Sequence, residues 1–209
     1  GLLFGVIASR GVNRWPDTLI STLGLIFYAT PSFWFGLMAI VVFSVYLQWL
    51  PPGGFEDIGN VQTGIWRVLD IAAHLVLPTL TLGLIFLAIY LRIMRASMLE
   101  VLNLDFVRTA RAKGLDETRI ITRHVLRNAL LPVVTLAGVH SGTLIGGAVI
   151  TETVFAWPGI GRLMYDALLQ RDYNLLLGVF VTCSVMVLIF NLITDLVYRL
   201  VDPRIEFAA

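Results

Sequence analysis

The sequence has few charged residues and a single cysteine, and each shortage limits what the chain can be. Charged residues make up 14% of the 209 residues, whereas soluble domains have about 25%. Hydrophobic residues make up 57%, and the mean hydropathy is +0.84. Cys183 lies in an apolar run, so a disulfide framework and a cysteine metal cluster are excluded. The composition predicts an integral membrane protein, with one all-α domain over residues 1–209.

Enzyme motifs are also lacking. The sequence contains no H-E-x-x-H, no G-x-S-x-G and no G-x-x-x-x-G-K-[ST] phosphate loop. We therefore expect no catalytic residues, no bound cofactor and no ATP hydrolysis on this chain. His74 and His140 lie inside apolar stretches, where ionisable groups are functional candidates. No third ligand has suitable spacing, so a hydrogen-bonding role is favoured over a metal site.

Four charge-free stretches are long enough to cross a membrane, because a bilayer core of about 30 Å needs roughly 20 apolar residues. They are Thr18–Phe55 (with a helix of about 18–49), Ile71–Leu91, Asn128–Thr151, and Tyr173–Thr194 continuing to about Leu200. Pro31 is expected to kink the first of them.

The chain starts within another apolar run, at residues 1–9. This run is too short to span and has neither a positive n-region nor a clear cleavage site, so it does not resemble a signal peptide. We interpret it as the tail of a span that begins upstream. The prediction is therefore about five spans, the first truncated, in a chain that is a fragment of a longer protein.

The arginines and the lysine predict the orientation of the spans. Only Arg67, Arg162 and Arg171 fall on one side. The other side has Arg10, Arg14, Arg92, Arg95, Arg108, Arg111, Lys113, Arg119, Arg123, Arg127, Arg199 and Arg204. This bias places the loop at 105–131 in the cytoplasm and the loops at about 50–70 and 152–172 outside.

The cytoplasmic loop is the one long polar segment, and its pattern predicts two short helices. The first runs from Asp105, as its capping residue, to about Lys113, and Gly114 ends it in the left-handed conformation. The second runs from about Glu117 to His124 with Asp116 as its N-cap, and Leu115 and Ile120 are placed to form a hydrophobic staple. Basic residues lie on one side of this helix, and Ile120, Ile121 and Val125 lie on the other.

A surface helix between two spans is a candidate docking site for a soluble partner. The alternative is that the basic residues only fix the orientation or bind anionic lipid. That alternative explains the charge but does not explain the capped break at Gly114 and Asp116.

Two segments of the chain resemble a known family. RTARAKG followed by HVLRNALLPVVT resembles the cytoplasmic loop of ABC-type importer permeases, and within them the dipeptide/oligopeptide group, which includes nickel and glutathione importers. The family pattern is Glu-Ala-Ala, three residues, Gly, nine residues, then Ile-x-Leu-Pro. Ala110, Gly114 and Leu126 match it. Arg108 and Thr109 replace Glu and Ala, while His124 and Arg127 replace Ile and Pro.

The second segment, ETVFAWPGIGRL, resembles the external loop of the same group. Glu152, Trp157, Pro158 and Gly159 match it and are expected to shape an external gate or a contact with a binding protein. Trp157 to Gly161 predicts a tight bend, followed by a short helix of about 161–169.

The resemblance implies a type I ABC importer transmembrane domain in a bacterial or archaeal plasma membrane. The implied partners are a second homologous permease, two ATPase subunits that carry ATP and Mg²⁺, and an external solute-binding protein. Peptides are the implied cargo, with glutathione or a nickel chelate as alternatives. The residues implied in coupling to the ATPase are Ala110, Gly114, Leu115, Asp116, Arg119, Ile120, Ile121 and His124.

Gly138, Gly142 and Gly146 recur every four residues and predict a helix face that a neighbouring helix can approach closely. The same face could line a pathway. Two other function classes stay open: a secondary transporter or channel without ATP coupling, and a membrane scaffold. Inverted repeats are not evident, and charges within the spans are almost absent, which argues against ion coupling.

Overall fold

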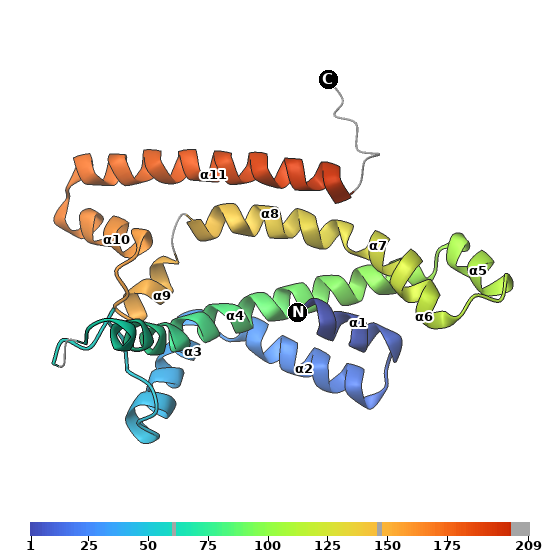
Figure 1. The fold of residues 1–209 in the computed structure, drawn as a ribbon, viewed down its shortest axis with the longest axis horizontal. Helices are drawn as coiled ribbons and strands as arrows, with labels where there is room; N and C mark the ends of the chain where they lie inside the picture. The colour runs from blue at the N-terminus through green and yellow to red at the C-terminus, as the bar shows by residue number, and fades with distance from the viewer. Residues whose placement is uncertain (60–61, 146–147, 202–209) are drawn as a thin grey trace. The chain divides into compact units, whose positions relative to one another are not determined.

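The computed structural model describes residues 1–59, 62–145 and 148–201, and within these ranges every regular element is a helix (Figure 1). The chain forms two compact units that alternate along the sequence. Unit 1 contains Gly1–Ala29 and Leu84–Ala137, and unit 2 contains Thr30–Gly83 and the residues from Gly138 onward. Helices α4 (Ile65–Leu102) and α8 (Leu131–Ile145) contribute residues to both units.

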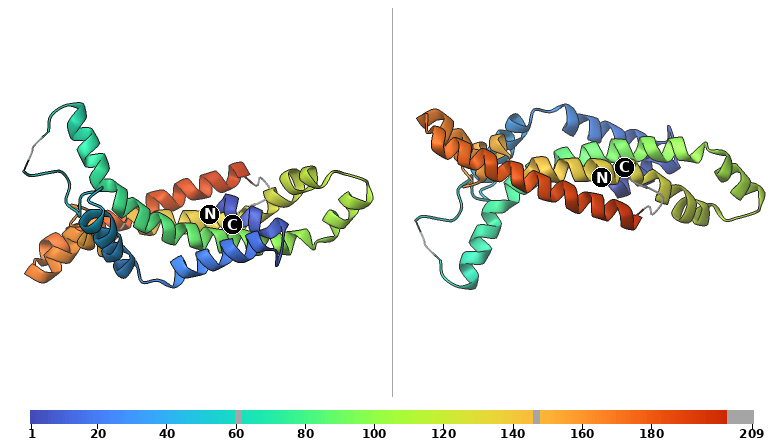
Figure 2. Two further views of the ribbon diagram at one scale, coloured as in Figure 1. Left: turned by 90° about the horizontal axis from the view of Figure 1, so that it is seen from below. Right: turned by 90° about the horizontal axis from the view of Figure 1, so that it is seen from above.

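Unit 1 places two short helices beside the second half of α4 (Figure 2). Gly5 lies so close to Met94 that a Cβ atom would come within 2.6 Å of the Met94 Cβ. A polar loop then joins α4 to α8. The remaining elements of unit 1 are α1 (Leu2–Arg10), α2 (Trp15–Ala29), α5 (Asp105–Ala112), α6 (Glu117–Ile120), the π-helical η2 (Ile121–Val125) and α7 (Leu126–Ala129).

Unit 2 contains the longest uninterrupted apolar helix after α4. This is α11 (Tyr173–Val201), which packs against α10. Helix α10 also packs against α9, and α9 packs against α3. The other elements of the unit are α3 (Ser32–Ala39), the π-helical η1 (Ile40–Tyr46), α9 (Val149–Val154) and α10 (Ile160–Gln170).

The predicted spans correspond to four helical segments. Two single helices, 65–102 and 173–194, are long and apolar enough to cross a membrane, and the number rises to four if each of two bent helix pairs is one span. The bent pairs are 15–46 and 117–142. The extension of the last span to about Leu200 is confirmed, because α11 ends at Val201.

Three of the predicted spans differ from the structure. The span predicted at 128–151 is not one helix, because α8 ends at Ile145 and α9 is a separate helix that begins at Val149. Pro31 does more than kink a helix: α2 ends at Ala29 and α3 begins at Ser32, since proline has no N–H and here has an extended ψ of 133°. Helix α4 has 38 residues instead of the predicted 21 at 71–91. A helix of that length is about 57 Å long, so it continues into polar surroundings beyond the charge-free stretch.

The glycine face of α8 packs as predicted at two of its three positions. A Cβ atom at Gly138 would overlap the side chain of Thr194, and one at Gly142 would meet Val187 at 3.4 Å. Both neighbours belong to α11. Gly146 lies outside the described residues. The helices α8 and α11 can therefore approach closely because glycine has no side chain at these two positions.

Replacing Gly138 with valine is expected to lower the free energy of unfolding by about 1–3 kcal/mol, because the added atoms overpack the α8–α11 contact. Gly178→Val is the matched control, since no atom lies within 4 Å of a Cβ atom at Gly178. Chemical unfolding of the detergent-solubilised variants measures the difference. Equal effects of the two substitutions would contradict the packing role of Gly138.

Candidate coupling loop and external loop

The loop at 105–131 has the predicted helix–turn–helix form. Helix α5 ends at Ala112, and Gly114 follows with φ of +76°, the left-handed conformation that glycine adopts without a Cβ clash. Asp116 caps α6, because its carboxylate accepts hydrogen bonds from the backbone N–H groups of Thr118 at 3.0 Å and Arg119 at 3.4 Å. The break in the loop is therefore fixed by one glycine and one aspartate.

Two details of this prediction were wrong. Asp105 is the first residue of α5 and makes no capping bond; Leu104 occupies the cap position, and the Asp105 carboxylate lies 3.7 Å from the Arg108 guanidinium. The second helix does not stop at His124. It continues through η2 and α7 to Ala129, because the buried apolar residues continue at Val125 and Ala129.

A small apolar core holds the loop against α4 and α8. The fully buried side chains include Met94 and Met98 from α4, Val107 from α5, and Ile120 and Val125 from the second helix, each 0% exposed. Leu115 packs against this cluster, which contains Ile120 and so agrees with the predicted staple. The remaining members of the core are Val101, Ala110, Ile121, Ala129 and Val133.

This burial changes which of the predicted coupling residues can touch a partner. Ile120 and Ile121 are 0% and 6% exposed, so their side chains support the loop from within and do not offer a direct contact. Ala110 is likewise buried at 7%. Arg119 and Asp116 are exposed, and His124 is half-buried. The coupling role of these residues stays a prediction.

The outer face of the loop is basic and exposed. Arg111 donates to Glu117 from Nε at 3.1 Å and Nη2 at 2.6 Å, a bidentate pair that ties α5 to α6 and raises the pKa of Arg111. Most of the other basic groups have no carboxylate partner among the described residues. The exposed basic residues of this face are Arg108, Arg111, Lys113, Arg119, Arg123 and Arg127.

Sequence reasoning missed an ion pair in unit 1 between a buried carboxylate and a half-buried arginine. Asp17 is 2% exposed, and its carboxylate accepts bonds from Arg95 Nε at 2.6 Å and Nη2 at 2.8 Å. The Asn13 N–H and the Ser21 hydroxyl donate to the same carboxylate. The pair joins α2 to α4. The two residues lie 78 positions apart, so no local pattern connects them.

In the external segment, the Glu152 carboxylate bonds to two separate stretches of backbone. It accepts from the Ala148 N–H at 2.9 Å, just before α9, and from the Arg162 N–H at 2.8 Å, in the first turn of α10. A negative group near a helix N-terminus is favourable. A Cβ atom at Gly159 would overlap this carboxylate, so the position needs glycine.

The same segment also packs against the turn at residues 51–54, which follows η1. Phe155 is 1% exposed, and its carbonyl accepts a bond from the Gly54 N–H at 2.8 Å. The rings of Phe55 and Trp157 lie 5.2 Å apart, within the range of favourable aromatic contact. Both predicted external loops therefore contribute to one packed cluster. The short helix predicted at 161–169 is present as α10.

Glu152→Ala is expected to lower the free energy of unfolding by about 2 kcal/mol, because two backbone N–H groups lose their acceptor. Glu100→Ala is the control, since Glu100 is exposed on α4 and its carboxylate has no bond among the described residues; its effect should stay within about 0.5 kcal/mol. Chemical unfolding of both variants gives the comparison. A Glu152→Ala effect no larger than that of Glu100→Ala would refute the bridging role.

The two histidines in apolar stretches belong to α4 and α8. His74 is 6% exposed, and its Nδ1 lies 2.9 Å from the Asp70 carbonyl in the same helix. Among the described residues, no group of three or more His, Cys, Asp or Glu side chains could hold a metal ion. The expected hydrogen bond was one across helices, but the hydrogen bond of His74 lies within its own helix.

Comparison with known proteins identifies relatives along the whole chain. The Bacillus subtilis (strain 168) oligopeptide transport system permease protein AppB is 44% identical over 204 residues, covering 98% of this chain and 63% of that protein. The Escherichia coli (strain K12) dipeptide transport system permease protein DppB is 43% identical, with 99% and 66% covered. The glutathione transport system permease protein GsiC of E. coli O1:K1 / APEC is 40% identical, with 99% and 63% covered. The chain thus spans just under two thirds of the length of these relatives.

The fold also resembles a solved structure. A chain of the MetNI methionine ABC transporter in an inward-facing conformation matches with a TM-score of 0.67 and 20% identity, covering 96% of this chain and 85% of that chain. The predicted all-α type I importer fold is confirmed. Residues 1–207 match the family described as binding-protein-dependent transport system inner membrane component, which also supports the predicted multi-pass location in the inner membrane. The chain belongs to this family of transport-system inner membrane components.

Proposed function

We propose that this chain is the permease subunit of an ATP-driven importer that depends on an external solute-binding protein. In this assembly, two separate ATPase subunits bind ATP and Mg²⁺, and the chain pairs with a second homologous permease. Peptides are the proposed cargo, because relatives are named for oligopeptide and dipeptide transport. Glutathione is a second candidate, favoured by the relative named for glutathione transport.

The observation that carries the proposal is the attachment of the loop to the membrane helices. A coupling element must move as one body with the spans that it drives, and it must have two arrangements that a partner can distinguish. Moving the loop away from α4 would expose buried apolar side chains to water, which is unfavourable. These side chains are Met94, Met98, Val107, Ile120 and Val125. A displacement of α6 is therefore transmitted to α4 and α8.

The outer face of the loop supplies the docking chemistry. Arg119 lies in the first turn of α6, is exposed and makes no ion pair among the described residues. An acidic or polar cleft on an ATPase subunit would complement this face. In this proposal Ile120 and Ile121 determine the position of the helix, and the exposed residues around Asp116 and Arg119 make the contact.

The test is a pull-down from detergent of the full-length chain expressed with its partner subunits. Arg119→Glu is expected to reduce the retained ATPase at least about tenfold, as reversing one charge in a close interface pair costs several kcal/mol. Arg14→Glu is the matched control, since Arg14 is exposed on the same predicted side and outside the loop; it should retain the ATPase. Retention by both variants, or no retention by the unmodified protein, would contradict the proposal.

A further inference from the structure

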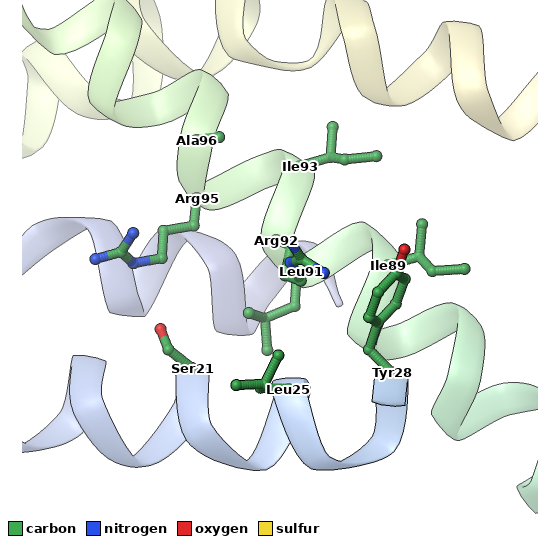
Figure 3. Close-up of a pocket in the computed structure, with 9 residues that line it drawn as sticks. All are labelled: Ser21, Leu25, Tyr28, Ile89, Leu91, Arg92, Ile93, Arg95 and Ala96. Carbon is green, nitrogen blue, oxygen red and sulfur yellow. The ribbon is translucent and has the colours of Figure 1, made fainter. Parts of the chain in front are cut away.

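A groove of about 590 Å³ lies between α2 and α4, entirely within unit 1. Figure 3 shows Arg92 and Arg95 on α4 above Ser21, Leu25 and Tyr28 on α2. The two arginines are the first charged residues after the charge-free stretch of α4, which ends at Leu91. The predicted orientation therefore places this groove at the cytoplasmic boundary of the membrane.

The two arginines differ in how their charge is compensated. Arg95 donates hydrogen bonds from Nε and Nη2 to the buried carboxylate of Asp17, so this ion pair is neutral overall. Arg92 is exposed, and no ion pair joins it to a carboxylate among the described residues. Its guanidinium carbon lies 4.5 Å from the centroid of the Tyr28 ring, a cation–π contact that orients the group without neutralising it. The groove therefore carries one uncompensated positive charge, which is held in place.

The rest of the groove is apolar. Leu25 and Leu91 face each other across it, and Ile89 extends the apolar wall of α4 (Figure 3). Leu91 also lines a second cavity of about 180 Å³, whose lining includes Phe4, Ile20 and Leu84 in the same unit. An apolar surface therefore continues directly from the charged site toward the charge-free part of α4.

We propose that this groove binds an anionic phospholipid, with Arg92 as the ligand of its phosphate. Basic pockets between membrane helices on the cytoplasmic side are typical sites for anionic headgroups. The planar guanidinium suits a phosphate because it can donate two parallel hydrogen bonds. The apolar wall formed by Leu25, Ile89 and Leu91 then receives the start of an acyl chain. A zwitterionic lipid also has a phosphate, but its ammonium group cancels the charge that Arg92 needs.

The experiment measures lipid retention by the full-length protein with its partner subunits, in nanodiscs of equal phosphatidylglycerol and phosphatidylcholine. Native mass spectrometry after release into detergent gives the ratio of the two lipids that stay bound. The unmodified protein is expected to retain phosphatidylglycerol preferentially. Arg92→Gln should reduce this preference about fivefold, the effect of about one arginine at an anionic surface.

Two control variants separate the groove from general surface charge. Arg14→Gln removes an exposed arginine on the same predicted side but outside the groove, and it should keep the preference. Tyr28→Phe keeps the ring under Arg92 and should keep the preference for phosphatidylglycerol. Tyr28→Ala removes the ring and should weaken this preference. The unfolding midpoint of each variant, measured in the same detergent, verifies that the assembly is folded.

Three results would overturn the proposal. One is an unmodified protein that retains both lipids equally. Another is an equal loss of preference in Arg14→Gln and Arg92→Gln, which would indicate bulk charge. The third is a loss of the second membrane subunit from the Arg92→Gln assembly with an unchanged lipid ratio, which would make the groove a contact between protein subunits.

Discussion

Replacing Asp17 with alanine is expected to lower the free energy of unfolding by about 2–3 kcal/mol, because the half-buried Arg95 loses a charged partner that accepts two of its hydrogen bonds. The Asp17 carboxylate is 2% exposed and holds the Arg95 guanidinium through bonds of 2.6 and 2.8 Å. It also satisfies the Asn13 N–H, which would lose its acceptor. Chemical unfolding of the full-length protein in detergent gives the value.

Asp105→Ala is the matched control for this prediction. Its side chain is 97% exposed, and its ion pair with Arg108 at 3.7 Å should contribute about 0–1 kcal/mol. The double variant Asp17→Asn with Arg95→Met should recover part of the loss, since replacing both members of an ion pair by groups of similar size costs less than removing one of them. An Asp17→Ala effect no larger than that of Asp105→Ala would show that the pair does not hold α2 to α4.

On the proposed function, Gly114→Val is expected to abolish most ATP-driven uptake of a dipeptide while the protein still inserts into the membrane. Gly114 has φ of +76°, and no atom of the chain lies within 4 Å of a Cβ atom placed there, so a Cβ atom at this position introduces backbone strain without a clash. A β-branched residue in this region costs about 1–3 kcal/mol. If the turn must hold its shape to transmit motion, that energy corresponds to a loss of about 5–150-fold in coupling.

The control for Gly114→Val is Gly114→Asn, because asparagine tolerates the left-handed conformation. This variant should keep most of the uptake, and both variants should reach the membrane in equal amounts. Normal uptake by Gly114→Val would contradict the role of the turn. Equal losses in the valine and asparagine variants would show that the substitution acts through something other than backbone strain.

Local features of this chain could be predicted from the sequence. Gly114 and Asp116 each act within three residues of their own position, and their side-chain chemistry determines the turn and the cap. Gly138 and Gly142 are four residues apart, so their shared helix face follows from helix geometry alone. Pro31 marked a real interruption, although its consequence is a break between two helices instead of a kink.

Features that depend on distant partners could not be predicted. The Asp17–Arg95 pair and the Glu152 bridge to Arg162 require knowledge of which elements pack together. The two positions in the first pair are separated by 78 residues. Hydropathy gave the apolar part of α4 but not its ends, because a helix continues wherever its hydrogen bonds and packing allow. Ile120 and Ile121 illustrate the same limit: the amphipathic pattern identified their apolar face but not the core that covers it.

On the proposed function, the loop at 105–131 moves as one body with the C-terminal end of α4. The most direct measurement is the distance between nitroxide labels at Lys113→Cys and Glu100→Cys, both exposed, in a Cys183→Ser background of the full-length assembly. A second label pair joins Lys113→Cys to Gln170→Cys on α10. Both distances are compared without nucleotide and with trapped ATP. We expect an unchanged Lys113–Glu100 distance and a changed Lys113–Gln170 distance. A changed Lys113–Glu100 distance, or no change in either distance, would show that the loop and α4 do not move together.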